Sequence, residues 1–176
     1  RRSIDTGRAG LSALLAALDN GLAAPFAEAV RIVRAARGRV IVSGVGKSGL
    51  VGRKIASIRT STGTPAFFVH PAEASHGDLG MITADDVVVA LSWSGESAEL
   101  KSVVEHSRRF RIPLVAMTAE SDSALARRAD VVLLMPPAVE ACPHGLAPTT
   151  STLMQLALCD ALAIALLESR GFTATD

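Results

Sequence analysis

Three short segments of the chain carry side chains whose types and spacing could do chemistry. One is the glycine turn from Gly44 to Gly49, the second is the serine run from Ser92 to Ser97, and the third is the segment from Glu140 to Thr152. Glycine turns and hydroxyl groups at the start of a helix bind anions through their N–H and O–H groups. A carboxylate beside such a turn could act as a general acid or base. Together these segments favour chemistry on a small anionic substrate.

The glycine turn matches two known phosphate-binding patterns only in part. It has the GxGxxG spacing of a dinucleotide fingerprint, but the following strand ends in Val69-His70-Pro71, without the acidic residue that would hold a ribose. A P-loop would need a glycine where the chain has Ile41. What remains is a turn at the positive end of a helix, with Lys47 and Ser48 available to an anion. The alternative is a tight turn in which Lys47 is merely solvated.

The serine run gives the more informative turn. Ser92, Ser94 and Ser97 surround Gly95 at the start of a helical pattern, where hydroxyls and free N–H groups would cradle a phosphate without a cation. Helix capping is the alternative, but a cap explains one serine and not the set. Glu99 lies within the first turn of that helix and is a candidate general base. Its alternative role is a favourable contact with the helix dipole.

Two histidines bracket a loop that could face the same site. His70 and His76 are close in sequence, but their spacing fits no compact zinc motif and Cys142 is remote. His106 falls within a helical pattern and is expected at the surface. The residues alone therefore give little support for a metal site.

Short β-branched runs alternate with helical patterns from Val40 onwards. Runs without polar alternation suit strands that are buried on both faces of a parallel sheet. We therefore expect strands at Val40–Val42, Ala66–Val69, Val87–Leu91, Leu114–Met117 and Val131–Leu134. Helical spacing predicts two N-terminal helices between Gly10 and Arg37 with a break at Asn20-Gly21, and helices at Ser48–Thr60, Ser97–Phe110, Ser123–Arg128 and Thr149–Glu168. This order predicts a doubly wound α/β domain whose ligands bind outside the carboxyl ends of the strands.

Composition narrows the class of protein. The net charge of +1 comes from 18 basic and 17 acidic residues, and aromatic residues make up only 3%. Both figures argue against nucleic-acid binding, which needs a basic face or stacking platforms. No run approaches the roughly 18 to 20 apolar residues of a membrane span, so no membrane partner is expected. Cys142 and Cys159 are interpreted as reduced thiols, which with the lack of a signal peptide predicts a cytoplasmic protein.

The motifs together resemble the sugar isomerase (SIS) domain, and more closely its branch of D-arabinose 5-phosphate isomerases. The resemblance runs from about Val40 to Phe172. Its motifs are GVGKSG (44–49), STGTPAFFVHP (61–71), EASHGDLGMI (73–82), SGES (94–97), EACPHGLAPTTST (140–152) and DALAIALLESRGF (160–172). SGES alone indicates only the superfamily, whereas HGDLGM, EACP and GLAPTTST are specific to the branch.

The resemblance implies a fold, a reaction and a set of site residues. The fold is a three-layer doubly wound sandwich with a five-stranded, mostly parallel sheet. The reaction is interconversion of D-ribulose 5-phosphate and D-arabinose 5-phosphate through an enediol, for synthesis of the lipopolysaccharide sugar Kdo, with no cofactor required. The catalytic residues would be Lys47, Glu99 and Glu140, with Glu99 as our choice of base, although Glu140 stays open for that role. The substrate contacts would be Gly46, Ser48, Gly63, Thr64, His76, Ser92, Ser94, Gly95 and Ser97.

The resemblance also implies partners, a domain arrangement and an inhibitor. It predicts a homo-oligomer, either a dimer or a tetramer, and inhibitory zinc on His70 and His76. Residues 1–38 would form N-terminal helices that pack on the domain, residues 39–172 the SIS domain, and residues 173–176 a shortened tail. The CBS pair that usually follows is absent, so the chain is either truncated or a natural short form.

Two departures from the family pattern leave alternatives open. A downstream Ser-His-Pro-Gly-Gly segment with a catalytic histidine is missing, and Trp93 stands where the family usually has asparagine, inside the phosphate turn. These departures favour a non-catalytic module that senses a sugar phosphate, or an isomerase with another sugar phosphate as substrate. Retention of Lys47, Glu99 and Glu140 favours the enzyme, because a binding module needs only the serines.

Overall fold

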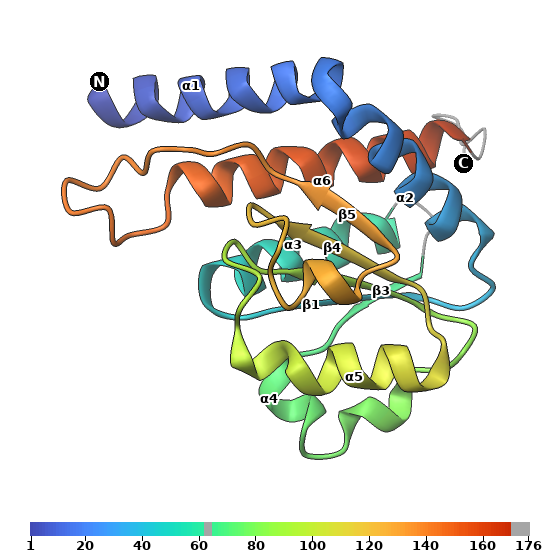
Figure 1. Cartoon of the computed structure of the whole chain (residues 1–176). Helices are drawn as coiled ribbons and strands as arrows, with labels where there is room; N and C mark the ends of the chain where they lie inside the picture. The colour runs from blue at the N-terminus through green and yellow to red at the C-terminus, as the bar shows by residue number, and fades with distance from the viewer. Residues whose placement is uncertain (62–64, 170–176) are drawn as a thin grey trace.

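Five short apolar runs form the strands of one parallel sheet (Figure 1). The computed structural model describes residues 1–61 and 65–169, and within that part the sheet order is β2-β1-β3-β4-β5. The strands are β1 (Val40–Gly44), β2 (Ala66–Phe68), β3 (Val87–Leu91), β4 (Leu114–Thr118) and β5 (Val131–Leu134). The five predicted strands are therefore confirmed. All their pairings are parallel, where the expectation was mostly parallel.

The strands lack polar alternation because the sheet has a core on each face. In β3, Val87, Val89 and Leu91 pack into one apolar cluster, while Val88 and Ala90 pack into the other. Successive side chains of a strand point to opposite faces, so a sheet that is covered twice needs apolar residues at every position. Each apolar run therefore continues as far as the strand is covered on both faces, and polar residues begin where the strand leaves the core.

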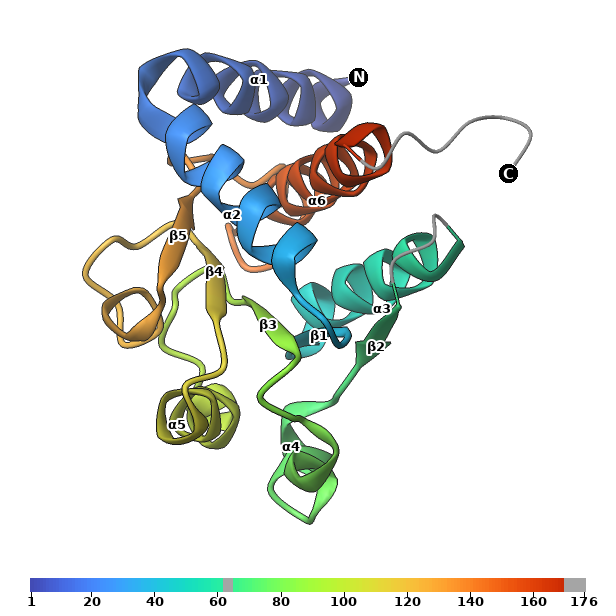
Figure 2. The same cartoon turned by 90° about the vertical axis from the view of Figure 1, so that its right-hand side faces the viewer.

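Helices supply the two covering layers. Figure 2 shows α2, α3 and α6 on one face of the sheet, with α1 lying outside α6, and α4 and α5 on the other face. The helices are α1 (Arg2–Ala17), α2 (Ala23–Ala35), α3 (Gly46–Ser61), α4 (Pro71–Ala74), α5 (Lys101–Phe110) and α6 (Thr150–Ser169).

Two predicted helices differ in the structure. The helix expected over Ser123–Arg128 is a turn that ends in one 3₁₀ segment, Ala126–Arg128. The helix expected from Ser97 begins with a separate 3₁₀ turn, Ala98–Leu100, before α5. Each 3₁₀ segment comes after a loop that contains serine, and serine favours turns over helix interiors, which leaves room only for a short helical turn.

The N-terminal segment folds as two helices that pack on α6. The break predicted at Asn20-Gly21 is confirmed, because both residues leave helical geometry and Gly21 has φ +112°. Leu14 and Leu22, with Ala29 and Val33 of α2, enter the core on the α6 side of the sheet. Both α1 and α2 therefore pack against α6.

Two segments are long and apolar enough to cross a membrane by length and composition, which the sequence analysis did not expect. They are Arg2–Ala35, which contains an 18-residue window with mean hydropathy 1.2, and α6, which contains one with mean hydropathy 1.6. The packing of α6 explains why it is so apolar. The helix contacts α1, α2 and α3, and half of the residues in its most apolar stretch are buried. A helix enclosed on several sides has few positions left for polar residues.

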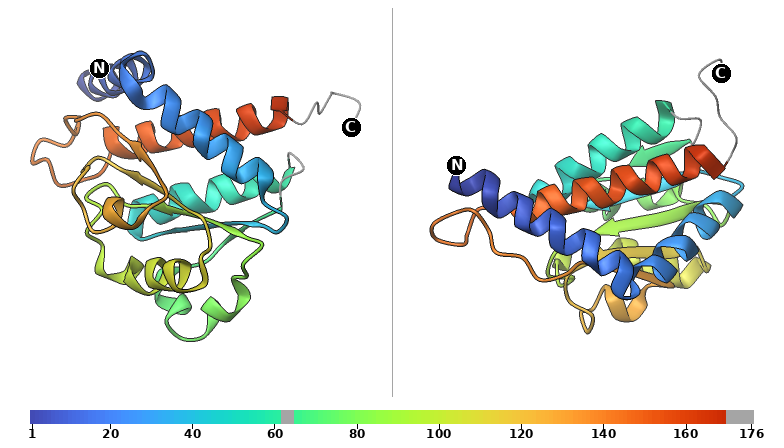
Figure 3. Two further views of the ribbon diagram at one scale, coloured as in Figure 1. Left: turned by 45° about the vertical axis from the view of Figure 1, so that its right-hand side comes forward. Right: turned by 90° about the horizontal axis from the view of Figure 1, so that it is seen from above.

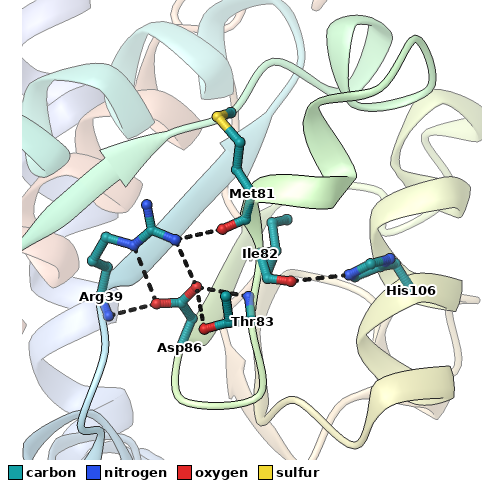
Figure 4. Close-up of polar contacts among 6 residues, drawn as sticks. All are labelled: Arg39, Met81, Ile82, Thr83, Asp86 and His106. Atoms are coloured by element: carbon teal, nitrogen blue, oxygen red, sulfur yellow. Dashed lines mark hydrogen bonds and ion pairs between the residues drawn. The ribbon is translucent and has the colours of Figure 1, made fainter.

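A buried carboxylate holds the amino-terminal edge of the sheet (Figure 4). Asp86, which is 1% exposed, accepts hydrogen bonds from the backbone N–H of Arg39 (2.7 Å) and of Thr83 (2.8 Å), and from the Arg39 guanidinium (3.0 Å). Arg39 also donates to the carbonyl of Met81. Nearby, His106 contacts the carbonyl of Ile82 at 3.3 Å and is half-buried, not fully at the surface as expected. The segment before β3 is thereby joined to the start of β1.

We expect Asp86→Asn to lower the free energy of unfolding by about 2–3 kcal/mol, because an amide cannot replace these charge-assisted bonds. Burial raises the pKa of Asp86, but the bonds from Arg39 and Thr83 outweigh burial and leave it below its usual range. The stabilisation is therefore complete above the unfolded-state pKa of about 3.9 and is lost as the pH falls through the lower folded-state pKa. Urea unfolding at several pH values measures this loss of stability.

Asp85→Asn is the control, since Asp85 forms an exposed pair with Arg37 and should change stability by less than about 0.5 kcal/mol. Equal effects from the two variants would contradict the prediction.

Candidate active site

The serine turn after β3 is braced from inside by one of its own hydroxyls. Ser92 is 3% exposed, and its Oγ accepts from the backbone N–H of Gly95 (3.1 Å) and lies 2.8 Å from Ser97 Oγ. The exposed Ser94 accepts from the N–H of Glu96 at 3.2 Å. Each hydroxyl has one proton to donate. Ser94 uses its oxygen as an acceptor and keeps its proton for a ligand. Ser97 also keeps its proton when Ser92 donates the bond between them. Ser92 shapes the turn, while Ser94 and Ser97 can donate to an anion.

Gly95 is required by both its conformation and its surroundings. Its φ is +65°, and a Cβ at this position would lie 2.0 Å from Ser123 Oγ. The carbonyl of Gly95 accepts from the N–H of Leu125, and Glu96 Oε1 accepts from the N–H of Ala124 at 2.7 Å. The loop that follows β4 therefore holds the turn in place.

Trp93 takes part in this turn through its backbone. Its carbonyl accepts from Thr118 Oγ1 (3.1 Å) and from the N–H of Ala119 (2.9 Å), while its half-buried side chain packs against the apolar core on the α6 side of the sheet. From the sequence, we expect the ring inside the phosphate turn. The structure instead assigns the ring a packing role.

The glycine turn after β1 begins α3 and brings Lys47 to the same edge. Gly44 of β1 pairs with Leu91 of β3, so this turn and the serine turn leave neighbouring strands at one level. A Cβ on Gly49 would lie 2.6 Å from the carbonyl oxygen of Gly44, so only glycine allows α3 to start this close to the strand. Lys47 is exposed, and within residues 1–61 and 65–169 no carboxylate forms an ion pair with it.

Ser48 points in another direction from the one the sequence suggested. Its Oγ donates to Oε1 of Gln155 on α6, at 3.0 Å. That bond uses its only proton, so in this arrangement the hydroxyl cannot also donate to a substrate. Ser48 was predicted as a substrate contact; its backbone N–H, in the first turn of α3, is the group that can still serve an anion.

Glu140 caps the N-terminus of α6. Its Oε2 accepts from Thr149 N and Thr149 Oγ1 (both 2.7 Å), from Thr150 N (2.7 Å) and from Ser151 N (3.4 Å). Partial burial raises the pKa of Glu140, but the hydrogen bonds from Ser151 and Thr149 outweigh it and leave the pKa below its usual range. A carboxylate from the loop before α6 thus accepts the hydrogen bonds that the first residues of this helix donate.

The predicted catalytic residues come to one end of the molecule. The loop from β5 to α6, which carries Glu140, extends beside the start of α1 (Figures 1 and 3). The Ser48–Gln155 bond joins the Lys47 turn to α6, whose first residues bind Glu140. Glu99 is exposed in the 3₁₀ turn after the serine run. In the described part of the chain, no hydrogen bond or ion pair links Lys47, Glu99 and Glu140 directly.

A cavity of about 350 Å³ opens beside the serine turn, on its α5 side. Leu100, Val104 and Leu125 give it an apolar wall, and Lys101 and Arg128 are at its rim. Its lining includes Gly95, Glu96 and Ser97 but none of the three predicted catalytic residues. We therefore expect substrate to react outside this cavity, at the carboxyl ends of β1 and β3, between the glycine turn and the serine turn.

Some predicted site residues remain outside this arrangement. Gly63 and Thr64, and the tail 173–176, lie outside the described residues. His70 caps α4, with Nδ1 accepting from the N–H of Ala72 at 3.3 Å, and His76 is exposed. Among the described residues no three His, Cys, Asp or Glu side chains converge as metal ligands. Zinc usually takes four ligands, so these two histidines do not by themselves make a zinc site.

Comparison with known proteins decides the family. Residues 32–165 match the SIS domain. The chain belongs to the SIS domain family. Its fold agrees with that of a protein from Escherichia coli CFT073 solved in complex with arabinose 5-phosphate, with a TM-score of 0.89 and 40% identity, covering 98% of this chain and 92% of that one.

Curated relatives are similar over the whole SIS domain. Arabinose 5-phosphate isomerase KdsD of Pseudomonas aeruginosa is 53% identical over 176 residues, which is 100% of this chain and 53% of that protein. KdsD of Escherichia coli K12 is 52% identical over 162 residues, which is 92% of this chain and 49% of that protein. The chain thus spans about half the length of the curated relatives it matches.

We expect Glu140→Ala to lower the free energy of unfolding by about 1–2 kcal/mol, the usual cost of losing a helix N-cap. Because the folded-state pKa of Glu140 is lowered, its stabilisation is present above the unfolded-state pKa and is lost as the pH falls through the folded-state value. Chemical unfolding between acidic and neutral pH measures both effects. Val139→Ala is the matched control, because that neighbouring side chain is 77% exposed. A difference between the two variants that does not shrink in acid would argue against the cap.

Proposed function

We propose that this SIS domain is an aldose-ketose isomerase that interconverts D-arabinose 5-phosphate and D-ribulose 5-phosphate. One observation carries the proposal: the serine turn and the Lys47 turn leave neighbouring parallel strands at the same level, with Glu99 and the Glu140 cap beside them. A phosphate handle next to a cation and carboxylates is what an enediol isomerisation needs. The similarity to isomerases named for arabinose 5-phosphate supports the substrate.

The reaction requires one base and one stabilised oxygen. The base removes the proton from C2 of the aldose, the electron pair forms the C1–C2 double bond of the enediol, and the proton returns to C1 while O1 and O2 exchange protonation. Nothing outside the sugar is oxidised or reduced. Lys47, as a nearby cation, would stabilise negative charge on the enediolate oxygen.

The two carboxylates are suited to different tasks. Glu140 has a lowered pKa and one oxygen committed to the start of α6, which makes it a weak base and a fixed negative group. Glu99 is exposed, and its carboxylate accepts no hydrogen bond from the described residues. We therefore assign Glu99 as the base and Glu140 as an orienting group.

Removing the base should abolish most of the turnover. In a coupled assay with both sugar phosphates, Glu99→Gln is expected to lower kcat by at least about a hundredfold, the usual contribution of a positioned general base. Glu105→Gln is the control, because Glu105 pairs with Lys101 farther along the chain at the surface of α5. Near-normal turnover of Glu99→Gln would refute the assignment of the base. Absence of turnover in the unsubstituted protein, with tight sugar-phosphate binding, would favour the sensor module instead.

The serine turn should control binding of the phosphate. Ser97→Ala removes a hydroxyl that can donate to the ligand, and we expect KM to rise about tenfold, the equivalent of about 1.4 kcal/mol for one lost bond to a charged group. Inorganic phosphate should compete with substrate less well in the same variant. Ser121→Ala, at an exposed position in the loop after β4, is the control. An unchanged KM for Ser97→Ala would place the phosphate elsewhere.

The wider setting of the enzyme is part of the proposal. We infer that the arabinose 5-phosphate serves synthesis of the lipopolysaccharide sugar Kdo, and that the domain works in the cytoplasm as a homo-oligomer. We also infer that zinc inhibits it, with His70 and His76 supplying two of the metal ligands and other groups the rest. Cys142 and Cys159 form no disulfide with each other, which supports a reducing compartment. Running the isomerase assay with and without a chelator tests whether bound zinc inhibits turnover.

A further inference from the structure

The side-chain amide of Gln155 is the least expected polar group in α6. Gln155 is 0% exposed, and it lies in a helix whose neighbouring inward residues, Met154 and Leu158, belong to the apolar core. Its Oε1 accepts from Ser48, but its Nε2 has no hydrogen-bond partner among the described residues. A buried amide with unpaired donors costs free energy, and a native protein that keeps one needs a reason for it.

Stability does not supply the reason. A methionine or leucine would fill a similar volume, suit the neighbouring residues and leave no unpaired donor. Ser48 is only partly buried, so water could satisfy its hydroxyl without Gln155. The amide is therefore useful only if the contact with Ser48 itself matters.

The contact joins the first turn of α3, which carries Lys47, to the helix that Glu140 caps. Ser48 directly follows Lys47 in the first turn of α3, and Gln155 lies one and a half turns beyond Thr150, whose N–H binds Glu140. The bond between Ser48 and Gln155 is 3.0 Å long. Because Gln155 is rigidly packed, it fixes the rotation of Ser48 and restrains the turn that presents Lys47.

We propose that Gln155 is a positioning residue, which acts through Ser48 to hold Lys47 in register with the Glu140-capped end of α6. This role rests on the proposed isomerase function. Gln155 itself touches no substrate, because its amide is enclosed by the core.

Two variants separate this role from a structural one. Gln155→Met removes both the bond and the unpaired donors, so the midpoint of urea unfolding should stay unchanged or rise, while kcat falls about tenfold to a hundredfold through loss of alignment. KM should change less than about twofold, since the serine turn is untouched. Gln155→Glu keeps an oxygen that accepts from Ser48 but buries a carboxyl group, so it should lower stability and yet restore most of kcat.

Hydrogen exchange gives a readout that does not depend on turnover. Deuterium uptake over residues 46–50 should be faster in Gln155→Met than in the unsubstituted protein, and near normal in Gln155→Glu. Leu158→Met is the matched control, as a volume-conserving change in the same buried stripe of α6 that should alter neither uptake nor kcat.

The possible outcomes decide the two proposals separately. Unchanged uptake over residues 46–50 in Gln155→Met, or full kcat in that variant, would overturn the positioning role. Faster uptake together with lower kcat and unimpaired stability would establish it. If the unsubstituted protein shows no isomerase turnover, the proposed function fails, and faster uptake in Gln155→Met then shows a restraint on the Lys47 turn that serves ligand binding only.

Discussion

The parallel course of the strands places all their carboxyl ends at one edge of the sheet, and the helices that follow begin there. α3 starts after β1, the 3₁₀ turn and α5 start after β3, and α6 starts beyond the loop after β5. The first N–H groups of each helix have no partner within the helix, and the helix dipoles add positive potential at the same place. An edge of this kind attracts anions before any charged side chain is added.

The same field acts on the protein's own carboxylates. Glu140 occupies the start of α6 and is held ionised there by hydrogen bonds from Thr149, Thr150 and Ser151. The hydrogen bonds that make Glu140 a good cap also make it a poor proton acceptor, so the proposed isomerase needs a base outside such a cap. Glu99 meets that condition, because its side chain is exposed in the 3₁₀ turn. The roles that we propose for the two acids follow from this difference in their hydrogen bonds.

The features that depend on local pattern could be predicted from sequence, and those that depend on contacts between distant segments could not. The strand Val87–Leu91 was predictable because burial on both faces leaves an uninterrupted apolar run. The bond from Ser48 to Gln155, and the packing of the Trp93 ring, join segments far apart in the chain. The sequence gives no indication that Gln155 is buried, because a single glutamine in an apolar helical pattern looks like a residue on the exposed side of the helix. Glu140 in a loop likewise gives no sign of the helix end that it caps.

The two ends of the sheet differ in one respect: among the described residues, buried side-chain groups without a hydrogen-bond partner are found near the carboxyl ends of the strands. At the amino edge, Asp86 has hydrogen bonds from Arg39 and Thr83 on both of its oxygens. Near the carboxyl edge, Thr150 Oγ1 and Gln155 Nε2 of α6 are buried without partners in the described part of the chain. Satisfied networks stabilise a fold, whereas unsatisfied groups are retained where position counts for more than stability. This difference agrees with the proposal that α3 and α6 are aligned for catalysis at the carboxyl ends of the strands, while Asp86 stabilises the opposite end of the sheet.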